Sequence, residues 1–581
     1  MKIFSKLSYV ACMLSMIWAA SFCPRWERHG GESSLGWDVS GYYWYLPSVF
    51  IYHDLKKQSF ADAVLQKYEF TGTNFQQGFR LPNGNYVMKY AAGMAVMYTP
   101  FFAVAHAVAP FTGYPADGFS KPYLVAISFG SLLMAFLGLW YLRKLLLRYY
   151  EDKVVAGVLL LLVIGTNYLN YTAIDGSLSH NWLFTIYVFI LLSTDNFYRT
   201  YQAKYAILTG LLCGLATLTR PTEIISLLIP LLWQMERLSF SALKDRFLLL
   251  RKRWYAVVLT ALAFAAIVFI QLLYWKYVSG NWLVYSYEDQ GFSWLHPHVF
   301  DYALSYKSGW IIYTPMAILF FAGIIPFLRS GKNKLAILLF FAINFYIVSA
   351  WDIWWYAGTG GRAMLQSYPV LVFLMAAFIQ AVFRIKYLWI LVLPVILVFA
   401  YVNIWFTVQA HGGQGLYDSE CMNKEYFWKV VGRWNVEENI FKLKDSPEVF
   451  EGTPESLTMV AKDSTTECLG KDLQFSKKRG FTIKTSPGNW IRVSADFSIQ
   501  QKEWNIWKMT MFFVSFRKGD QLVKENAMRV HRYLHDGDKK TLYLDIKVPE
   551  QPFDTLSVQF WNGDNDKPIC INNLELFEFT E

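Results

Sequence analysis

Uninterrupted apolar runs of about 20 residues recur through the first 410 residues of this chain. Examples are "AVVLTALAFAAIVFIQLLYW" at 256–275 and "LWILVLPVILVFAYVNIWF" at 388–406. Each run is close to the ~20 residues that a helix needs to cross a bilayer. The composition agrees, because 54% of the residues are hydrophobic and only 17% are charged. The chain is therefore predicted to be a polytopic α-helical membrane protein.

Hydropathy predicts about eleven membrane-spanning helices. The first run follows Lys2 and Lys6 and precedes the small-residue stretch "WAASF", so it also resembles a signal peptide. We favour an uncleaved first helix, because many further spans follow it. The predicted spans are 4–21, 122–142, 154–172, 181–196, 205–219, 222–235, 255–275, 309–327, 334–350, 363–383 and 387–408.

The basic residues predict the orientation of these spans. The net charge of +10 comes largely from alternate loops, as expected when Lys and Arg remain on the cytoplasmic side. This pattern places the N-terminus in the cytoplasm and gives no reason to expect a nucleic-acid partner. The basic residues of the predicted inner loops are Arg143, Lys144, Arg148, Arg199, Lys204, Arg237, Lys244, Arg246, Arg251, Lys252, Arg253, Arg329, Lys332, Lys334, Arg384 and Lys386.

Two larger segments then lie outside the cytoplasm. One is the loop 22–121, whose apolar stretch 91–110 is expected to lie at the membrane surface, since a crossing there would invert the charge pattern. The other is 411–581, which follows the membrane domain 1–410. Its β-rich runs alternate with turns such as "RKGD" and "NGDNDKP", and they predict a jelly-roll-like antiparallel β-sandwich. Cys421, Cys468 and Cys570 allow one disulfide and leave one thiol.

Ionisable groups at the outer rim of a membrane protein are costly and are therefore candidates for function. The predicted outer loops bring several such groups to one face of the protein. No GxSxG motif, P-loop, HExxH motif or paired CxxC occurs. The candidate side chains are Asp38, Arg80, Lys89, Asp175, His180, Asn181, Arg220, Glu288, Asp289, His296, His298, Asp352 and Arg362.

Several motifs, in this order, resemble the GT-C membrane glycosyltransferases. They are an early Asp in a long first outer loop, "KYAAGMAVMYTPFFAVAHA", "GLLCGLATLTRPTE" and "WWYAGTGGR". The resemblance covers about residues 1–410 and is greatest to protein O-mannosyltransferases and aminoarabinose transferases. It implies a GT-C fold and transfer, with inversion, of a sugar from a polyprenyl-phosphate donor to an acceptor outside the cytoplasm. The expected acceptor is a glycan, lipid or protein, and the enzyme is expected to lie in a bacterial inner membrane.

The resemblance makes Asp38 the catalytic candidate, because the first outer loop of these enzymes carries an acidic motif near the active site. A partly desolvated carboxylate can take the proton of an acceptor hydroxyl. Many relatives carry adjacent acids, whereas Val39 follows Asp38 here. Both base action and help in holding a divalent metal remain open, and a helix cap is the structural alternative. The aromatic residues 42–45 are expected to dock the loop on the bilayer.

Three cations are candidate ligands of the donor phosphate. Relatives place a Lys that faces the lipid phosphate at the position of Lys89. Arg362 follows a glycine-rich turn, and its guanidinium matches phosphate oxygens. For both residues, snorkelling to lipid headgroups is the alternative. Arg220 in "TRPTE" is the third candidate, with pairing to Glu223 as its alternative.

The remaining polar residues are expected to line the acceptor side or the pocket. They are Asp175, His180, Glu288, Asp289 and His296. The "HPH" at 296–298 matches no strong zinc spacing, so no metal ligands are assigned. A lipid-linked saccharide transporter or flippase is the competing function, although internal repeats typical of transporters are not evident. A non-catalytic scaffold would not need the outer Asp, Lys and Arg residues.

Overall fold

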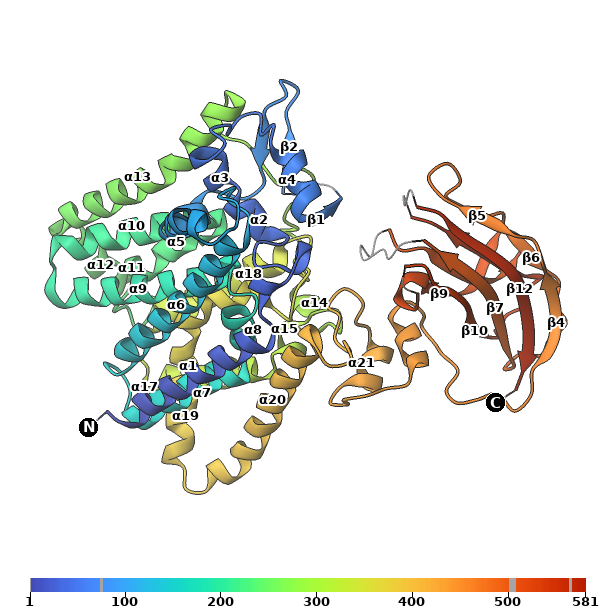
Figure 1. Ribbon diagram of the computed structural model, residues 1–581. Helices are drawn as coiled ribbons and strands as arrows, with labels where there is room; N and C mark the ends of the chain where they lie inside the picture. Colours follow the sequence, from blue (N-terminus) through green and yellow to red (C-terminus); the bar gives the residue numbers. More distant parts are fainter. Residues whose placement is uncertain (1, 74–76, 501–507, 535, 564–566, 581) are drawn as a thin grey trace. The chain divides into compact units, whose positions relative to one another are not determined.

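The computed structural model describes residues 2–580 except 74–76, 501–507, 535 and 564–566. The chain forms two compact units, Met1–Glu420 and Cys421–Glu581 (Figure 1). The sequence analysis placed the boundary between the units after residue 410, where the apolar pattern ends. The first unit extends ten residues further because Leu416 and Tyr417 are buried in it, with the Tyr417 ring against Phe406 and Tyr313.

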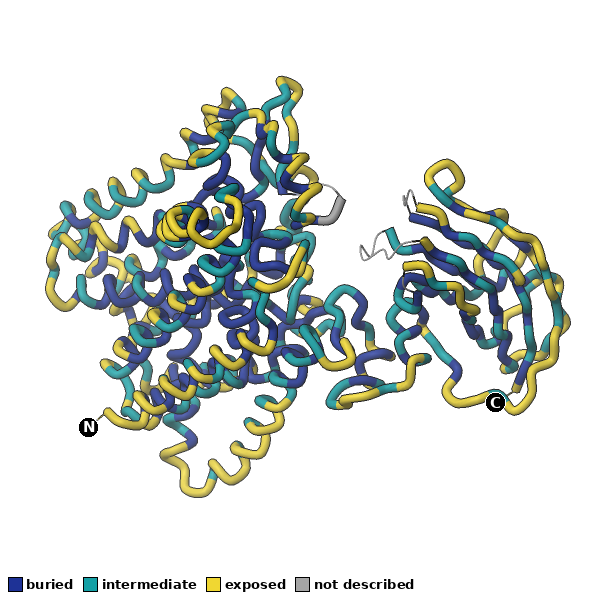
Figure 2. The backbone as a smooth tube through the Cα atoms, in the orientation of Figure 1, coloured by how far each residue is buried: buried dark blue, intermediate teal, exposed yellow. Residues whose placement is uncertain are grey.

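Six helical segments in the described part of the first unit are long and apolar enough to cross a membrane. Two of them, α13 and α20, expose most of their length (Figure 2), as expected for apolar helices that face lipid. The six segments contain α1 (Phe4–Phe22), α5 (Gly93–Val108), α6 (Lys121–Leu146), α13 (Trp254–Ser279), α19 (Tyr368–Arg384) and α20 (Leu388–His411), with adjoining 3-10 turns in some cases.

The predicted count of eleven spans is wrong by this measure. Five of the six long segments coincide with predicted spans, and the sixth, α5, is the stretch expected at the membrane surface. One other predicted span, 309–327, is interrupted at Pro315, and Pro221 separates the two short predicted spans 205–219 and 222–235. Arg220 and Thr314 precede Pro221 and Pro315 and leave the helical conformation, as residues before proline tend to do.

The other helices of the first unit are shorter or more polar. α9 is long but carries the buried Asp195 near its end. The elements are α7 (Asp152–Gly165), α8 (Tyr168–Ala173), α9 (Ser179–Thr200), α10 (Ala203–Thr219), η4 (Pro221–Leu227), α11 (Leu228–Leu232), α12 (Phe240–Lys252), α14 (Val299–Leu304), α15 (Trp310–Tyr313), η5 (Pro315–Ala317), α16 (Ile318–Ala322), α17 (Ile324–Ser330), α18 (Lys334–Ala350) and η6 (Arg362–Ser367).

Close packing of α10 against α13 depends on two glycines. Gly210 and Gly214 lie one helical turn apart in "GLLCG", the spacing that lets apolar helices approach closely. A Cβ at Gly210 would lie 2.3 Å from the Thr260 carbonyl oxygen of α13. This packing carries the end of α10, and therefore Arg220, to a fixed position.

The loop 22–121 folds into short elements that cover the helices. Its aromatic residues Tyr42, Tyr43, Trp44 and Tyr45 are buried within the protein, so the expectation that they dock on the bilayer is wrong. The Tyr43 hydroxyl, for example, donates to the Gly118 carbonyl at 2.5 Å. The elements around α5 are η1 (Arg25–Glu27), η2 (Gly30–Glu32), α2 (Asp38–Tyr43), α3 (Tyr45–Phe50), α4 (Ala61–Tyr68), β1 (Phe70–Thr73), β2 (Gly78–Arg80), β3 (Tyr86–Met88) and η3 (Ala109–Phe111).

The second unit contains two antiparallel sheets, in the order β10-β7-β12-β4 with β5 beside β12, and β6-β11-β8-β9. Alternate residues of both sheets form one apolar core, which includes Val493 of β7 and Val514 of β8. The elements are α21 (Lys424–Val430), η7 (Glu438–Lys444), β4 (Thr458–Asp463), β5 (Glu467–Leu469), β6 (Arg479–Phe481), β7 (Trp490–Ile499), β8 (Met511–Lys518), β9 (Gln521–Arg529), η8 (Val530–Arg532), β10 (Lys539–Lys547), β11 (Thr555–Trp561) and β12 (Ile569–Phe579).

The cysteines of the second unit form one disulfide. Cys468 of β5 and Cys570 of β12 occupy paired positions of the sheet and are bonded to each other. Cys421 is buried and takes no part in a disulfide. The sequence predicted one bridge among these three cysteines but not which pair forms it.

Replacing both Cys468 and Cys570 by Ala should lower the free energy of unfolding of the second unit by about 2–5 kcal/mol, because the bridge closes a long loop in the unfolded chain. Pulse proteolysis of the full-length protein in urea, followed through a C-terminal epitope, measures this change. Cys421→Ser is the control and should leave the midpoint nearly unchanged. An unchanged midpoint in the double variant would contradict a stabilising role for the bridge.

Candidate functional site

Asp38 and Arg362 form an ion pair although they lie 324 positions apart in the sequence. The Arg362 Nη2 donates to Asp38 Oδ2 at 3.0 Å. Both side chains are partly buried, with 26% of Asp38 and 15% of Arg362 exposed. Asp38 is the acidic residue in the first turn of α2, directly after the cap residue Trp37. Its carboxylate faces the Arg362 guanidinium.

The turn "GTGGR" holds Arg362 in this position. Gly361 has a φ of +69°, in the left-handed region that favours glycine, and a Cβ there would lie 2.3 Å from the Trp310 ring. The Gly360 carbonyl accepts a hydrogen bond from Asn167 Nδ2 at 2.8 Å. At Gly358 a Cβ would lie 2.8 Å from Arg362 Cδ. The glycines thus let the turn pack tightly beside the guanidinium.

Non-glycine residues with positive φ precede both members of the pair. Trp37, directly before Asp38, has a φ of 50°. Tyr356 and Ala357, which lead into the "GTGG" turn, have φ values of 53° and 44°. Such conformations cost energy and are concentrated at functional sites. The strain therefore marks the two segments that bring Asp38 and Arg362 together.

Arg220 lies on the other side of Arg362, close enough for the two positive charges to repel each other. Its Nη1 is 3.4 Å from His180 Nδ1, and the same His180 nitrogen lies 2.8 Å from Gln366 Oε1. Glu223 does not form an ion pair with Arg220. Its carboxylate instead accepts hydrogen bonds from Tyr187 and from Gln366. Arg220 and Glu223 nevertheless attract each other, so the predicted pairing is present as a longer-range attraction and not as a direct contact.

Four tyrosines surround these charges and bring Lys89 to the same place. Tyr42 stacks on Tyr90, with ring centroids 4.3 Å apart, and Tyr90 meets the edge of Tyr287 at 6.0 Å. Lys89 Nζ lies 5.5 Å from the centre of the Tyr287 ring. We call these residues the Asp38 cluster. Its members are Asp38, Tyr42, Lys89, Tyr90, Arg220, Tyr287, Tyr356 and Arg362.

Asp38, Arg220 and Arg362 act electrostatically on the same tyrosine of the first unit. Burial raises the pKa of the Tyr42 phenol, Arg220 and Arg362 oppose this shift, and Asp38 adds to it. Burial also raises the pKa of Tyr356, against the influence of Arg220 and Arg362. Two guanidiniums therefore act on these rings against the carboxylates of Asp38 and Glu223. With Lys89 the cluster brings three cations together, which suits an anionic ligand.

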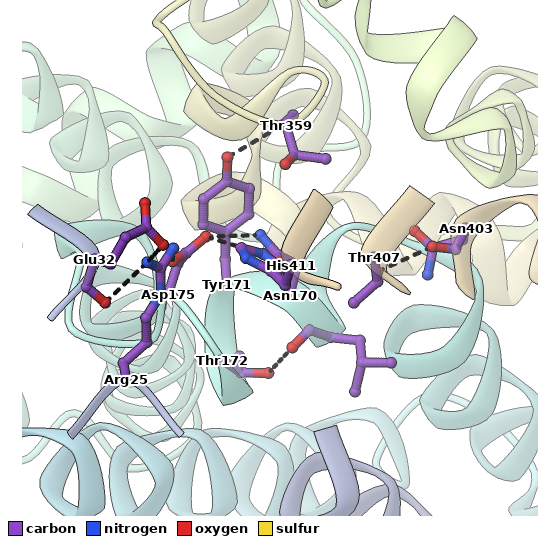
Figure 3. Close-up of polar contacts among 11 residues, drawn as sticks. Arg25, Glu32, Asn170, Tyr171, Thr172, Asp175, Thr359, Asn403, Thr407 and His411 are labelled. Atoms are coloured by element: carbon purple, nitrogen blue, oxygen red, sulfur yellow. Dashed lines mark hydrogen bonds and ion pairs between the residues drawn. The ribbon is translucent and has the colours of Figure 1, made fainter. Parts of the chain in front are cut away.

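Asp175, by contrast, belongs to a separate network (Figure 3). Its carboxylate accepts hydrogen bonds from Arg25 Nη2 at 2.7 Å and from Asn170 Nδ2 at 3.1 Å, and it lies 3.6 Å from His411 Nε2. Arg25 also binds Glu32. These contacts tie together the ends of α1 and α20, the turn η2 and the connection from α8 to α9, which indicates a positioning role for Asp175.

Three predicted pocket residues are not brought into the Asp38 cluster. Glu288, Asp289 and His296 are exposed, and no hydrogen bond or ion pair joins their side chains to the cluster. Over the described ranges, no group of three His, Cys, Asp or Glu side chains is arranged to hold a metal ion. His180, on the other hand, contacts Arg220 as described above.

The sequence interpretation missed the tyrosines of the cluster and two partners of Asp175. Tyr287 directly precedes Glu288, so the predicted loop was correct but the wrong side chains were chosen in it. Arg25 follows the first apolar helix and His411 ends the last one, and neither was named as a candidate. A signal was present in both cases, because an ionisable residue at the end of an apolar helix needs a partner or water.

Asp175→Asn should destabilise the protein at neutral pH by about 2 kcal/mol, because Arg25 loses a partly buried ion-pair partner. Burial alone raises the pKa of the Asp175 carboxyl, but Arg25 and His411 outweigh it and leave the pKa below the ordinary value. The stabilisation is therefore present above the ordinary carboxyl pKa and is lost as pH falls towards the lowered value.

Thermal unfolding in detergent at pH 7 and pH 3.5 tests this prediction. The difference between wild type and Asp175→Asn should be clear at pH 7 and smaller at pH 3.5. Asp62→Asn, a change at an exposed carboxylate of α4, is the matched control. Equal unfolding temperatures at pH 7 would show that the Asp175 network does not stabilise the fold.

Comparisons with known proteins identify no relative of this chain. No family model matches the sequence, and no curated protein matches it. The residues of the Asp38 cluster and the resemblance described above are therefore the basis for a functional assignment.

Proposed function

We propose that the chain is an inverting GT-C glycosyltransferase of a bacterial inner membrane. It transfers a sugar from a polyprenyl-phosphate donor to an acceptor hydroxyl on the extracytoplasmic face. The observation that carries the proposal is the meeting of Asp38 with Arg362 and Arg220, which come from three distant segments. A carboxylate for proton removal and cations for a phosphate leaving group are the two requirements of this reaction.

Asp38 acts as the general base. Its carboxylate takes the proton of the acceptor hydroxyl while the acceptor oxygen forms a bond to the anomeric carbon of the sugar. The bond from that carbon to the phosphate oxygen breaks, and its electron pair leaves with the polyprenyl phosphate. Attack from the face opposite the phosphate inverts the anomeric configuration. Because Asp38 is partly buried, water solvates its carboxylate less than it would at an open surface.

Arg362 and Arg220 bind the phosphate, and Lys89 approaches from the Tyr287 side. The donor phosphate offers Arg362 a second anion in addition to Asp38. Sharing the guanidinium in this way weakens its hold on the Asp38 carboxylate and makes that carboxylate a better proton acceptor. Donor binding would then prepare Asp38 as the base. In this order of events, the 3.0 Å ion pair is the state before the donor binds.

A divalent cation, if one is bound, would be held by Asp38 together with the donor phosphate. Mg²⁺ is commonly held by one or two carboxylates together with substrate phosphates and water. Asp38 is the carboxylate that the cluster would supply, and the cation would add to the charge stabilisation that the arginines provide. Transfer assays with EDTA and with added Mg²⁺ decide whether the reaction depends on a metal.

A flippase for a lipid-linked saccharide is the second candidate. It is favoured by the interrupted helices, because transporters often build their binding sites where helices are broken. Arg220 lies at such a break, between α10 and η4. A flippase would move the labelled lipid across the membrane of a vesicle without cleaving the bond between sugar and phosphate, so product analysis separates the two functions.

Asp38→Asn should lower the rate constant of transfer about 10²- to 10⁴-fold, because the amide cannot accept the acceptor proton. The assay uses purified protein with labelled polyprenyl-phosphate mannose or polyprenyl-phosphate aminoarabinose. Asp54→Asn changes a carboxylate of the same loop that binds only Ser59 and nearby backbone, and it should retain activity. Unchanged transfer by Asp38→Asn would remove Asp38 from catalysis.

Arg362→Lys should raise the KM for the donor about tenfold or more, since an ammonium cannot make the two parallel hydrogen bonds of a guanidinium to phosphate. The same assay at varied donor concentration measures KM and kcat separately. Arg28→Lys changes an exposed arginine near the end of α1 and is the control. An unchanged donor KM in Arg362→Lys would show that Arg362 does not bind the phosphate.

A further inference from the structure

The second unit contains a small pocket between η7 and the sheet edge formed by β10. The pocket has a volume of about 100 Å³, enough for a carboxylate and part of the group that carries it. Its lining comes from η7, from β9 and from β10, together with Tyr533 just after η8. The residues that matter here are Glu438, Asn439, Lys442, Tyr533, Lys540 and Tyr543.

Lys442 presents a buried amine to this pocket. Only 5% of the residue is exposed, and its Nζ makes no hydrogen bond within the described structure. The amine lies 3.2 Å from the centre of the Tyr543 ring, which supplies its main contact. A buried ammonium without an acidic partner is costly, so such a group usually has a ligand or a partner.

The acids near Lys442 are already paired with other cations. Asp545 binds Arg492 through two hydrogen bonds, at 2.8 and 2.9 Å, and Glu438 lies 3.6 Å from Lys540 at the rim. Burial lowers the pKa of Lys442 to about 7, with Asp545 and Glu438 opposing this shift and Arg492 adding to it. A bound anion would restore the charged form of this amine.

Two other lining residues also have buried polar atoms without a hydrogen-bond partner. They are Asn439 Oδ1 and the hydroxyl of Tyr533. The Asn439 amide nitrogen donates to the Phe450 carbonyl, which fixes the orientation of the side chain and leaves Oδ1 as a free acceptor. An oxygen that only accepts requires a donor such as a hydroxyl group. The pocket therefore combines a cation with groups suited to hydroxyls.

We propose that this pocket binds a hydroxylated carboxylate, the chemistry of an acidic sugar residue. Lys442 Nζ pairs with the carboxylate, and the Tyr533 hydroxyl donates to it. Asn439 Oδ1 accepts from a neighbouring ligand hydroxyl. The site lies entirely within the second unit and does not depend on the function proposed for the first.

Titration of the full-length protein with galacturonate, followed by ligand-observed NMR, tests the proposal directly. Galacturonate should bind at least tenfold more tightly than galactose, which lacks the carboxylate, and than acetate, which lacks the hydroxyls. Its affinity should fall about tenfold between pH 6 and pH 8, as Lys442 loses its proton. Equal binding of galactose or acetate, no binding of galacturonate, or no pH dependence would each overturn the proposal.

Two matched variants locate the site. Lys442→Met keeps the aliphatic stem but removes the amine, and it should weaken galacturonate binding at least tenfold. Lys462→Met removes a lysine that pairs with Glu575 on the other side of the same sheet, and it should bind like wild type. Retained galacturonate binding by a folded Lys442→Met protein would place the ligand elsewhere. The ligand preference is measured on the wild-type protein, so the proposal can be tested even if a variant fails to fold.

Discussion

The first unit depends on the pairing of charges in apolar surroundings. An isolated charge removed from water is costly, and the protein therefore gives its buried acids cationic or hydrogen-bonding partners. Asp195 binds Arg148 and Arg199, and Asp175 binds Arg25. The pairs of Asp195 with Arg148 and of Asp175 with Arg25 join segments that are distant in the sequence and so help to determine the fold, whereas Asp195 and Arg199 both lie in α9. In the Asp38 cluster Arg362 pairs with Asp38, whereas Arg220 contacts His180 and forms no ion pair with the described residues.

The interruptions of the helices give this cluster its position. A continuous helix satisfies its own backbone and presents side chains only from its surface. Where α10 ends before Pro221, Arg220 leaves the helix and can reach His180. Where the chain turns through "GTGG", Arg362 is carried to Asp38. The breaks that reduce the number of long apolar helices therefore also create the candidate site.

Much of the arrangement could be predicted from the sequence, and the failures have physical reasons. Apolar runs predicted five of the six long helices, and alternation with polar turns predicted five of the nine described strands of the second unit. Hydropathy counts residues but does not register a break, so the interruption at Pro315 was missed, whereas the break at Pro221 was predicted from "TRPTE". The burial of Tyr42 depends on packing against Tyr90, which no local pattern shows. Asp38, Arg220 and Arg362 were found because charges beside apolar segments are rare.

In the second unit too, charge pairing separates the residues that stabilise the fold from those that can bind a ligand. Arg492 and Asp545 neutralise each other across neighbouring strands, which stabilises the sheet and leaves no charge for a ligand. Lys442 is the cation that this pairing leaves over, and its amine lies against the Tyr543 ring, which attracts a positive charge without neutralising it. A cation held in this way is available to an incoming anion, whereas one paired with a carboxylate must first exchange partners.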